Sequence, residues 1–238
     1  MKKILVSLVV LVVLVFLAFY LGRNMIVERS VEEGGEYALG VETSLASAEV
    51  GLTHGRCELN RYKIDNPEGF EQEKFLTIDK FVFDIEAGSI FDEAVVIDSF
   101  IIDGLVLNLE QIDANGNYSQ ILNHIKELDM GESSDSDSES KIIIKKVSLS
   151  EITVNTAITL LGKKQHEGSF AIDSFELTNV GGDDGMTVSQ LSGFLVKTLI
   201  NKSLSSGKFP ASLSGKIDEL KDDGKELLED GLNKLLKK

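Results

Sequence analysis

The chain of 238 residues is acidic: 39 Asp and Glu stand against 24 Lys and Arg, which gives a formal net charge of −15. Such a surface repels phosphate backbones and anionic headgroups, so we expect no nucleic-acid partner. Hydrophobic residues make up 42% of the chain, enough for one sizeable core beside a membrane segment. The single cysteine, Cys57, cannot form an internal disulfide, so packing alone must hold the fold.

A long apolar run lies close to the start of the chain. No charge interrupts the segment from Ile4 to Leu21, and at about 1.5 Å per residue a helix of this length matches the hydrocarbon core of a bilayer. We therefore predict a transmembrane anchor over residues 1–23. A cleaved secretory signal is the alternative, but the run is longer than a usual signal core, and Phe19 and Tyr20 are bulky for a cleavage site.

The residues that flank this run predict its orientation. Lys2 and Lys3 favour a cytoplasmic N-terminus because basic residues resist translocation. The rest of the chain would then lie on the other side of the membrane. Residues 24–40 are polar and contain glycines, so we expect them to form a helical or loose stem.

Strand-like chemistry begins after the stem. β-Branched and aromatic residues lie between turn signals, which predicts a β-rich meander within one domain over residues 41–204. The expected strands cover residues 41–52, 57–64, 75–85, 94–102, 105–110, 141–150, 151–161 and 169–180. Apolar residues alternate with polar ones in the strand 151–161, so we expect it to have one solvated face.

Two helices are expected inside this domain. Asn117, with Gln120 at the third helical position, predicts the start of the first. An acidic stretch over residues 130–140 follows, and it has too few apolar residues to be buried, so we expect a solvated linker. The spacing of Thr187 and Gln190 is typical of a capping box and predicts the start of the closing helix.

Residues 205–238 are predicted to form a C-terminal amphipathic helix after a break at Pro210. Its regular part runs from Lys216 to Lys238. Gly224 and Gly231 each weaken this helix by about 1 kcal/mol relative to Ala, so it needs a surface to dock on. Its apolar stripe consists of Ile217, Leu220, Leu227, Leu228, Leu235 and Leu236.

Three expected strands share the pattern Ile-Asp-x-Phe, at residues 78–81, 97–100 and 172–175. In each, the apolar residues are two apart, then three apart, then two apart. A step of three changes the face that a strand presents, unless a β-bulge or a strong coil at the Asp-x pair keeps both halves on the same core. The pattern therefore predicts a bent sheet. Chance recurrence in an apolar chain remains the alternative to a true repeat.

Motifs typical of enzymes and metal sites are absent from the sequence. It contains no GxSxG, phosphate-binding loop, HExxH or CxxC, and its three histidines lie in different segments. Asp183 and Asp184, and the acids of residues 130–140, lack the ligand spacing of a calcium loop. We therefore expect neither an enzyme nor a bound metal or cofactor.

A proline marks the end of the second expected strand. Pro67 has no N–H to donate and holds Asn66 in an extended conformation, so strand pairing stops there. Gly69 can adopt a backbone angle that other residues resist, which lets Phe70 fold back under the turn. An ordinary loop proline would give the same geometry, so these residues inform on fold more than on function.

The segment that ends in Asn66-Pro67-Glu68-Gly69-Phe70 resembles a signature of small membrane-anchored proteins of the AsmA-like family. The strands that follow, the helix at Asn117, and the later motifs FAIDSFELTNVGG and TVSQLSGFLVKTLINKSL are similar to the order of elements in that family. The resemblance covers most of residues 1–204. It implies an inner-membrane protein of bacteria whose C-terminal domain is periplasmic and handles phospholipid or maintains the outer membrane.

The fold that we expect is α+β, mainly β: a transmembrane helix, a curved antiparallel β-groove sheet with packing helices, and C-terminal helices. By the resemblance, the groove would shelter acyl chains, each buried CH₂ contributing about 0.8 kcal/mol. Core packing beneath the helices is the alternative for each of these side chains. The candidate groove residues are Phe81, Phe83, Ile97, Phe100, Ile102, Leu107, Leu109 and Phe175.

A second functional class stays open beside lipid handling. A membrane-tethered scaffold domain, with its sheet filled by its own helices, would instead recruit a protein partner through the sheet edges. The expected partners are thus the membrane, a phospholipid, and envelope proteins or further copies of the chain. An open apolar trough would favour lipid handling, whereas a trough filled by residues 187–204 would favour the scaffold.

Overall fold

The structure is a computed structural model that describes residues 22, 24–51, 55–86, 88–89, 92–131 and 141–208. Within these ranges no helix is long and apolar enough to cross a membrane. The predicted anchor, most of the acidic linker (residues 132–140) and the predicted helix from Lys216 onward lie outside the described residues.

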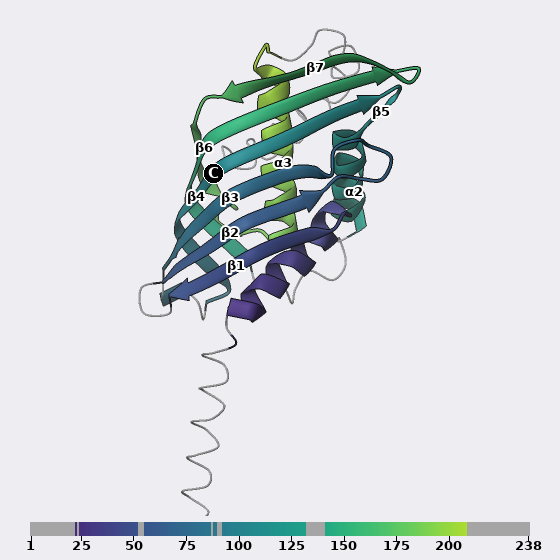
Figure 1. The fold of residues 1–238 in the computed structure, drawn as a ribbon. Helices are drawn as coiled ribbons and strands as arrows, with labels where there is room; N and C mark the ends of the chain where they lie inside the picture. Colours follow the sequence, from purple (N-terminus) through teal and green to yellow (C-terminus); the bar gives the residue numbers. More distant parts are fainter. Residues whose placement is uncertain are drawn as a thin grey trace, which may run out of the picture.

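Eight strands form one sheet, in the order β1-β2-β3-β4-β6-β7, with β5 beside β4 and β8 beside β6 (Figure 1). An α+β fold that is mainly β is therefore confirmed. The strands are β1 (Thr43–Gly51), β2 (Arg56–Asp65), β3 (Lys74–Ile85), β4 (Ala94–Ile112), β5 (Asn115–Gly116), β6 (Lys141–Leu160), β7 (Lys163–Ile172) and β8 (Phe175–Val180).

The prediction of an antiparallel sheet is wrong for its central pair. β4 and β6 run parallel, with Ala94 opposite Lys141 and Ile112 opposite Thr159. Parallel neighbours need a long crossover, and helix α2 (Asn117–Gly131) lies between β5 and β6 in the chain. The sheet is therefore mixed.

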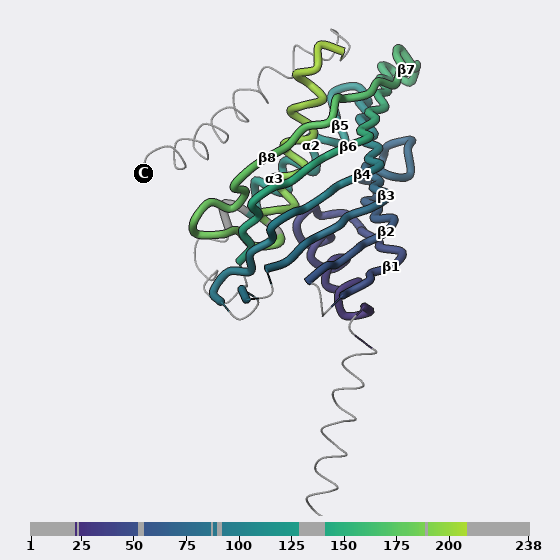
Figure 2. Tube along the Cα trace, turned by 90° about the vertical axis from the view of Figure 1, so that its left-hand side faces the viewer, coloured from purple at the N-terminus to yellow at the C-terminus, as the bar shows by residue number. Residues whose placement is uncertain are grey.

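Three helices lie against the sheet. The first covers residues 24–39 and runs beside β1, while α2 and α3 (Val188–Ser205) lie behind the strands in Figure 1. The predicted capping box of α3 is confirmed, because Thr187 Oγ1 accepts from Gln190 N and the Gln190 side chain accepts from Thr187 N. The view in Figure 2 shows the sheet bending around these helices.

Several expected strands are continuous in the structure. The expected strands 94–102 and 105–110 form the single strand β4 through Gly104, and 141–150 and 151–161 form β6 through Glu151. Both of these residues have a positive φ, 68° for Gly104 and 52° for Glu151. The residues Gly104 and Glu151, which separate the expected strands in the sequence, therefore mark positions of left-handed backbone inside long strands rather than strand ends.

These interruptions line up across the sheet and form a first crease. Arg61 in β2, Asp79 in β3, Gly104 in β4 and Glu151 in β6 each interrupt the ladder of paired residues, while the register on the two sides of the interruption stays the same. In β3, Ile78 and Phe81 on either side of the crease are both buried in the core. The step of three at Ile-Asp-x-Phe thus leaves both halves of β3 on the same core, as predicted, and it does so without the register shift of a β-bulge. The crease bends every strand that it crosses.

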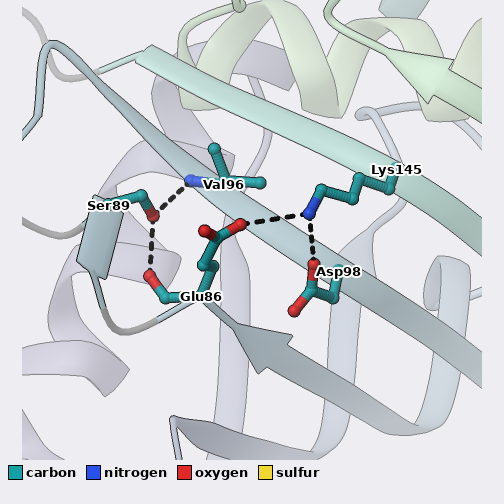
Figure 3. Close-up of polar contacts among 5 residues, drawn as sticks. All are labelled: Glu86, Ser89, Val96, Asp98 and Lys145. Carbon is teal, nitrogen blue, oxygen red and sulfur yellow. Dashed lines mark hydrogen bonds and ion pairs between the residues drawn. The ribbon is translucent and has the colours of Figure 1, made fainter.

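A second crease crosses the sheet at the next Ile-Asp-x-Phe pattern (Figure 3). Lys145 Nζ on β6 lies 2.7 Å from Asp98 Oδ1 on β4 and 3.0 Å from Glu86 Oε2 after β3. Hydrogen bonds to Asp98 and then Glu86 raise the pKa of Lys145. Ser89 closes the adjoining turn: it donates to Glu86 O and accepts from Val96 N. All three charged groups of the triad are exposed, so it aligns the strands more than it stabilises the fold.

Candidate functional site: the inner face and the two edges of the sheet

The inner face of the sheet, which packs against the helices, holds all eight candidate groove residues. Six of them are buried: Phe81, Ile97, Phe100, Ile102, Leu107 and Leu109. The other two, Phe83 and Phe175, are half-buried and pack against the same core. Helices α2 and α3 contribute the opposing buried side chains, among them Tyr118, Ile121, Ile125, Val196, Leu199 and Ile200.

Aromatic rings pack together on the part of this face around Phe81 and Phe100. The rings of Phe83 and Phe100 stack with centroids 4.2 Å apart, and Phe81 lies 5.5 Å from Phe100 and 5.6 Å from Tyr62. Such contacts stabilise a core by about 0.5–1.5 kcal/mol per pair beyond burial. The described residues therefore fill the face of the sheet that the resemblance makes a lipid groove.

The four predicted turn residues lie together after β2. The strand ends at Asp65, and Asn66 N donates to Glu73 O at 3.1 Å, which closes the loop before β3. Gly69 has a φ of 95°, which favours glycine. Pro67 is buried and Phe70 half-buried, and the end of β2 at Asp65 agrees with the predicted strand terminator.

A buried polar cluster, which the sequence did not reveal, holds this turn in place. The carboxylate of Glu110, only 3% exposed, accepts hydrogen bonds from Asn66 Nδ2, Glu71 N and Gln72 N at 2.7–2.9 Å. Because it is saturated by protein donors, Glu110 acts as a structural anchor for the turn.

Asn117 completes the cluster at the start of α2. Its side-chain oxygen accepts from the N–H groups of Glu110 and Tyr118, while its amide donates to Asn66 Oδ1 and Asn108 O. The predicted helix start is correct, but Asn117 bonds these groups instead of capping toward Gln120. Among the described residues no buried side-chain nitrogen or oxygen lacks a partner.

The first edge of the sheet, β1, is covered by the helix at residues 24–39. Leu45 N donates to Glu32 Oε1 at 2.8 Å, Ala48 N to Glu28 Oε1 at 3.0 Å, and Val50 N to an acceptor one turn earlier in the helix, Asn24 Oδ1, at 3.3 Å. Four helical residues rise about 6 Å, close to the roughly 6.7 Å that separates Ala48 from Val50, two strand residues apart; Leu45 lies three residues before Ala48. The helix thus closes this edge.

A close fit holds this helix against the strands. Thr43 Oγ1 donates to Glu32 O at 2.7 Å, and the Tyr62 hydroxyl lies directly against Gly35, where a Cβ would clash. Burial raises the pKa of Tyr62 to about 12; the hydrogen bond with Thr43 acts in the opposite direction, and the charge of Glu32 adds a smaller increase. Residues 24–39 are therefore packed into the domain along their length.

The opposite edge, β7, is open in the described part of the chain. Ala171 O accepts from Lys208 Nζ at 2.9 Å, so the backbone N–H and C=O of Ala171 point away from β6. Because this direction alternates along a strand, the backbone groups of Ser169 and Glu167 point away from β6 as well. Within the described residues, Lys208 is the only hydrogen-bond partner of the outward backbone groups of these three residues. Strand edges of this kind are templates for pairing with another chain.

The hairpin that leads into β7 ends in an exposed apolar tip. Leu161 is 91% exposed and has a φ of 49°, and Gly162 follows with a φ of 71°. A left-handed backbone costs a branched residue about 1–2 kcal/mol, and exposure of its side chain adds no compensation. Leu161 N donates to Asp113 Oδ1 at 2.7 Å. The left-handed backbone and the exposure of the apolar side chain therefore both disfavour a leucine at this position.

A shallow hollow lies on the outer face of the sheet, over the first crease. Asp79, Glu151 and Asp173 line it together with small and apolar residues. No group of His, Cys, Asp or Glu side chains among the described residues is placed to hold a metal ion. The hollow is an acidic, solvated surface without a built site.

Comparison with models of known protein families found no match, and neither did comparison with curated proteins.

Proposed function

We propose that this protein is a non-catalytic, membrane-tethered scaffold domain of AsmA-like type, which recruits a protein partner by strand addition at β7. The observation that carries the proposal is the difference between the two sheet edges: β1 is covered by a helix, whereas β7 presents outward backbone groups. The inner face supports it, because helices α2 and α3 pack their side chains into the same core as that face.

The chemistry of β7 indicates the kind of partner. An extended segment adds to an open edge through main-chain hydrogen bonds, and alternate side chains supply specificity. Lys163 and Lys164 lie at the hairpin end of β7, next to Leu160 and Leu161, so an extended segment with acidic and apolar residues fits this end. Lys164 also pairs with Glu71 and Glu167, both at 3.3 Å, which ties the hairpin to the turn after β2.

A photoreactive residue at position 167 tests the proposal in intact cells. We expect covalent capture of a distinct protein there, and little capture from position 49 on the covered strand β1. Ser169→Pro should abolish capture, because proline removes an outward N–H without breaking a bond to β6. Equal capture from both positions, or capture that survives Ser169→Pro, would contradict strand addition at β7.

Phospholipid handling remains the second candidate, favoured by the half-buried Phe83 and Phe175 at the margins of the inner face. An acyl chain could reach that face only if α3 moved, since α3 contributes side chains to the same core. Mass spectrometry of the detergent-extracted protein separates the candidates. About one phospholipid per chain, lost on substitution of Phe83, would favour lipid handling over the scaffold.

A further inference from the structure

The open edge of β7 belongs to a sheet whose other edge is covered. The helix at residues 24–39 already supplies acceptors to outward N–H groups of β1, so a strand of a second copy finds these donors occupied. Contacts between β7 of one copy and β1 of the next, which would grow into an open filament, are thereby disfavoured. Pairing of β7 with β7 of a second copy, in contrast, closes after two chains.

The outward backbone groups of β7 are regularly spaced along the middle of the strand. From His166 to Ile172 the strand pairs with β6 without a register shift, so Glu167, Ser169 and Ala171 present their N–H and C=O groups in one line. An antiparallel copy centred on Ser169 exchanges both hydrogen bonds between the two Ser169 residues, and both between each Glu167 and the Ala171 of the other copy. All outward groups of the regular part of β7 are then paired.

The charges along β7 exclude two of the alternative registers. A pair centred on Glu167 would place the two Glu167 carboxylates opposite each other, and a pair centred on Phe170 would place Glu167 opposite Asp173. Like charges directly opposite each other destabilise strand pairing. In a pair centred on Ser169, Glu167 lies opposite the small and uncharged Ala171 instead.

The sizes of the side chains favour the same register. Phe170 and Gly168 are half-buried on the inner face, and in a pair centred on Ser169 each Phe170 lies opposite the Gly168 of the other copy. An aromatic ring beside an edge glycine covers the backbone that the glycine leaves bare. A pair centred on Gly168 would leave two glycines face to face and would need Gln165, at the register shift of β7, as a hydrogen-bonding partner.

The charges at the two ends of β7 complement each other in an antiparallel pair. Lys163 at the hairpin end and Asp173 just after the strand are exposed, and neither has an ion-pair partner in the part of the chain that the structure describes. Antiparallel pairing brings each Lys163 to the end of the other strand that carries Asp173. Lys164 keeps its own partners, Glu71 and Glu167.

We propose that two copies of this chain pair antiparallel through β7, in the register centred on Ser169, when no other strand occupies the edge. The inference rests on the open edge that the proposed function uses, and it names a second copy as the occupant. The two-fold axis of the pair is perpendicular to the sheet, so one membrane can hold both copies if this axis lies along the membrane normal. The interface is small, so we expect a dissociation constant on the order of 10 µM. At about 1 µM most chains are then monomers with a free β7.

Sedimentation equilibrium of the full-length protein in detergent, from about 1 to about 100 µM, tests the pairing. We expect the parent to change from monomer to dimer across this range. Ser169→Pro should remain a monomer, because proline removes the N–H at the centre of the pair without breaking a bond to β6. Ser169→Thr keeps this N–H and should dimerise as the parent does. A parent that stays monomeric, or a proline variant that dimerises equally well, would overturn the proposal.

Substitution of Ala171 tests the register. Ala171→Lys places a lysine opposite Glu167 of the other copy and should tighten the dimer about fivefold, whereas Ala171→Glu places like charges there and should weaken it about fivefold. The matched controls are Ala46→Lys and Ala46→Glu, at an exposed alanine of β1, and they should leave the dissociation constant unchanged. No change at position 171, or a change in the same direction for both variants, would refute the pair centred on Ser169.

Photocapture at position 167 separates this inference from the recruiting function. A dimer in detergent, together with capture of only a second copy in cells, would establish the self-pairing and remove the recruitment of another protein. Capture of another protein by a chain that stays monomeric in detergent would leave the recruiting edge standing and refute the dimer.

Discussion

The two edges of the sheet differ in the partners of their outward backbone groups. At β1, a helix of the domain supplies a carboxylate or amide acceptor to each of three successive outward N–H groups. At β7, a single lysine reaches one outward carbonyl within the described residues. Burial follows the same division, since β1 contributes Leu45 and Ala48 to the core whereas no residue of β7 is buried. In the part of the chain that the structure describes, a helix therefore covers one edge of the sheet and leaves the other edge uncovered.

The largest expected effect at the covered edge is the pH dependence of stability that Tyr62 causes. Its pKa of about 12 in the folded state lies above the usual value of 10.0, so the protonated hydroxyl stabilises the fold fully below pH 10. This stability is lost as the pH rises from 10 to 12, by about 2–3 kcal/mol. We expect urea unfolding to show this loss in the parent and not in Tyr62→Phe. Parallel alkaline curves for both proteins would mean that the helix does not bury the hydroxyl.

Gly35→Ala tests the fit of the same helix. The new methyl group would clash with the Tyr62 hydroxyl and Thr43, so we expect a destabilisation of about 2 kcal/mol in urea. Gly34→Ala is the matched control, because its Cβ would meet only Val188 at an ordinary 3.5 Å. Alanine also favours a helix by about 1 kcal/mol over glycine. The control should therefore be neutral or stabilising, and similar losses in both variants would contradict the close fit at Gly35.

Removal of the acceptors at β1 tests the hydrogen bonds alone. Glu28→Ala with Glu32→Ala should cost about 1–2 kcal/mol and speed the amide exchange of Ala48 and Leu45. Glu33→Ala, an exposed position of the same helix, should change neither quantity. Fast exchange at β1 in the unmodified protein would refute the covered edge at once.

The smallest effect is expected at the open side, where stability should rise. Leu161→Asn places a residue that tolerates a left-handed backbone at a φ of 49°, so we expect a gain of about 0.5–1 kcal/mol in thermal or urea unfolding. The same variant should weaken partner capture at position 167 if Leu161 contributes to the recruiting edge. A loss of stability would show that the exposed leucine has a structural role.

Much of the fold could be predicted because its signals are local. The first two Ile-Asp-x-Phe steps mark creases with buried residues on both sides, whereas the third separates β7 from β8, and Thr187 with Gln190 forms the expected capping box. The parallel pairing of β4 and β6 was not predictable in this way, because it depends on where a crossover returns the chain.

The parts of the candidate site that were missed depend on distant partners. Glu28 and Glu32 read as ordinary surface acids of a stem, and only the position of β1 makes them acceptors for its amides. Glu110 ends an apolar strand, and its donors Asn66 and Gln72 lie about forty residues earlier in the chain. Hydrophobic periodicity carries no information on such pairings.

Amide exchange at both edges of a chain that ends after Lys208 tests the central claim most directly. The account predicts slow exchange at Leu45, Ala48 and Val50 of β1, and exchange near the unprotected rate at Glu167 and Ser169 of β7. Equal protection at the two edges would contradict it, because the sheet would then have no open side at which a partner strand could add.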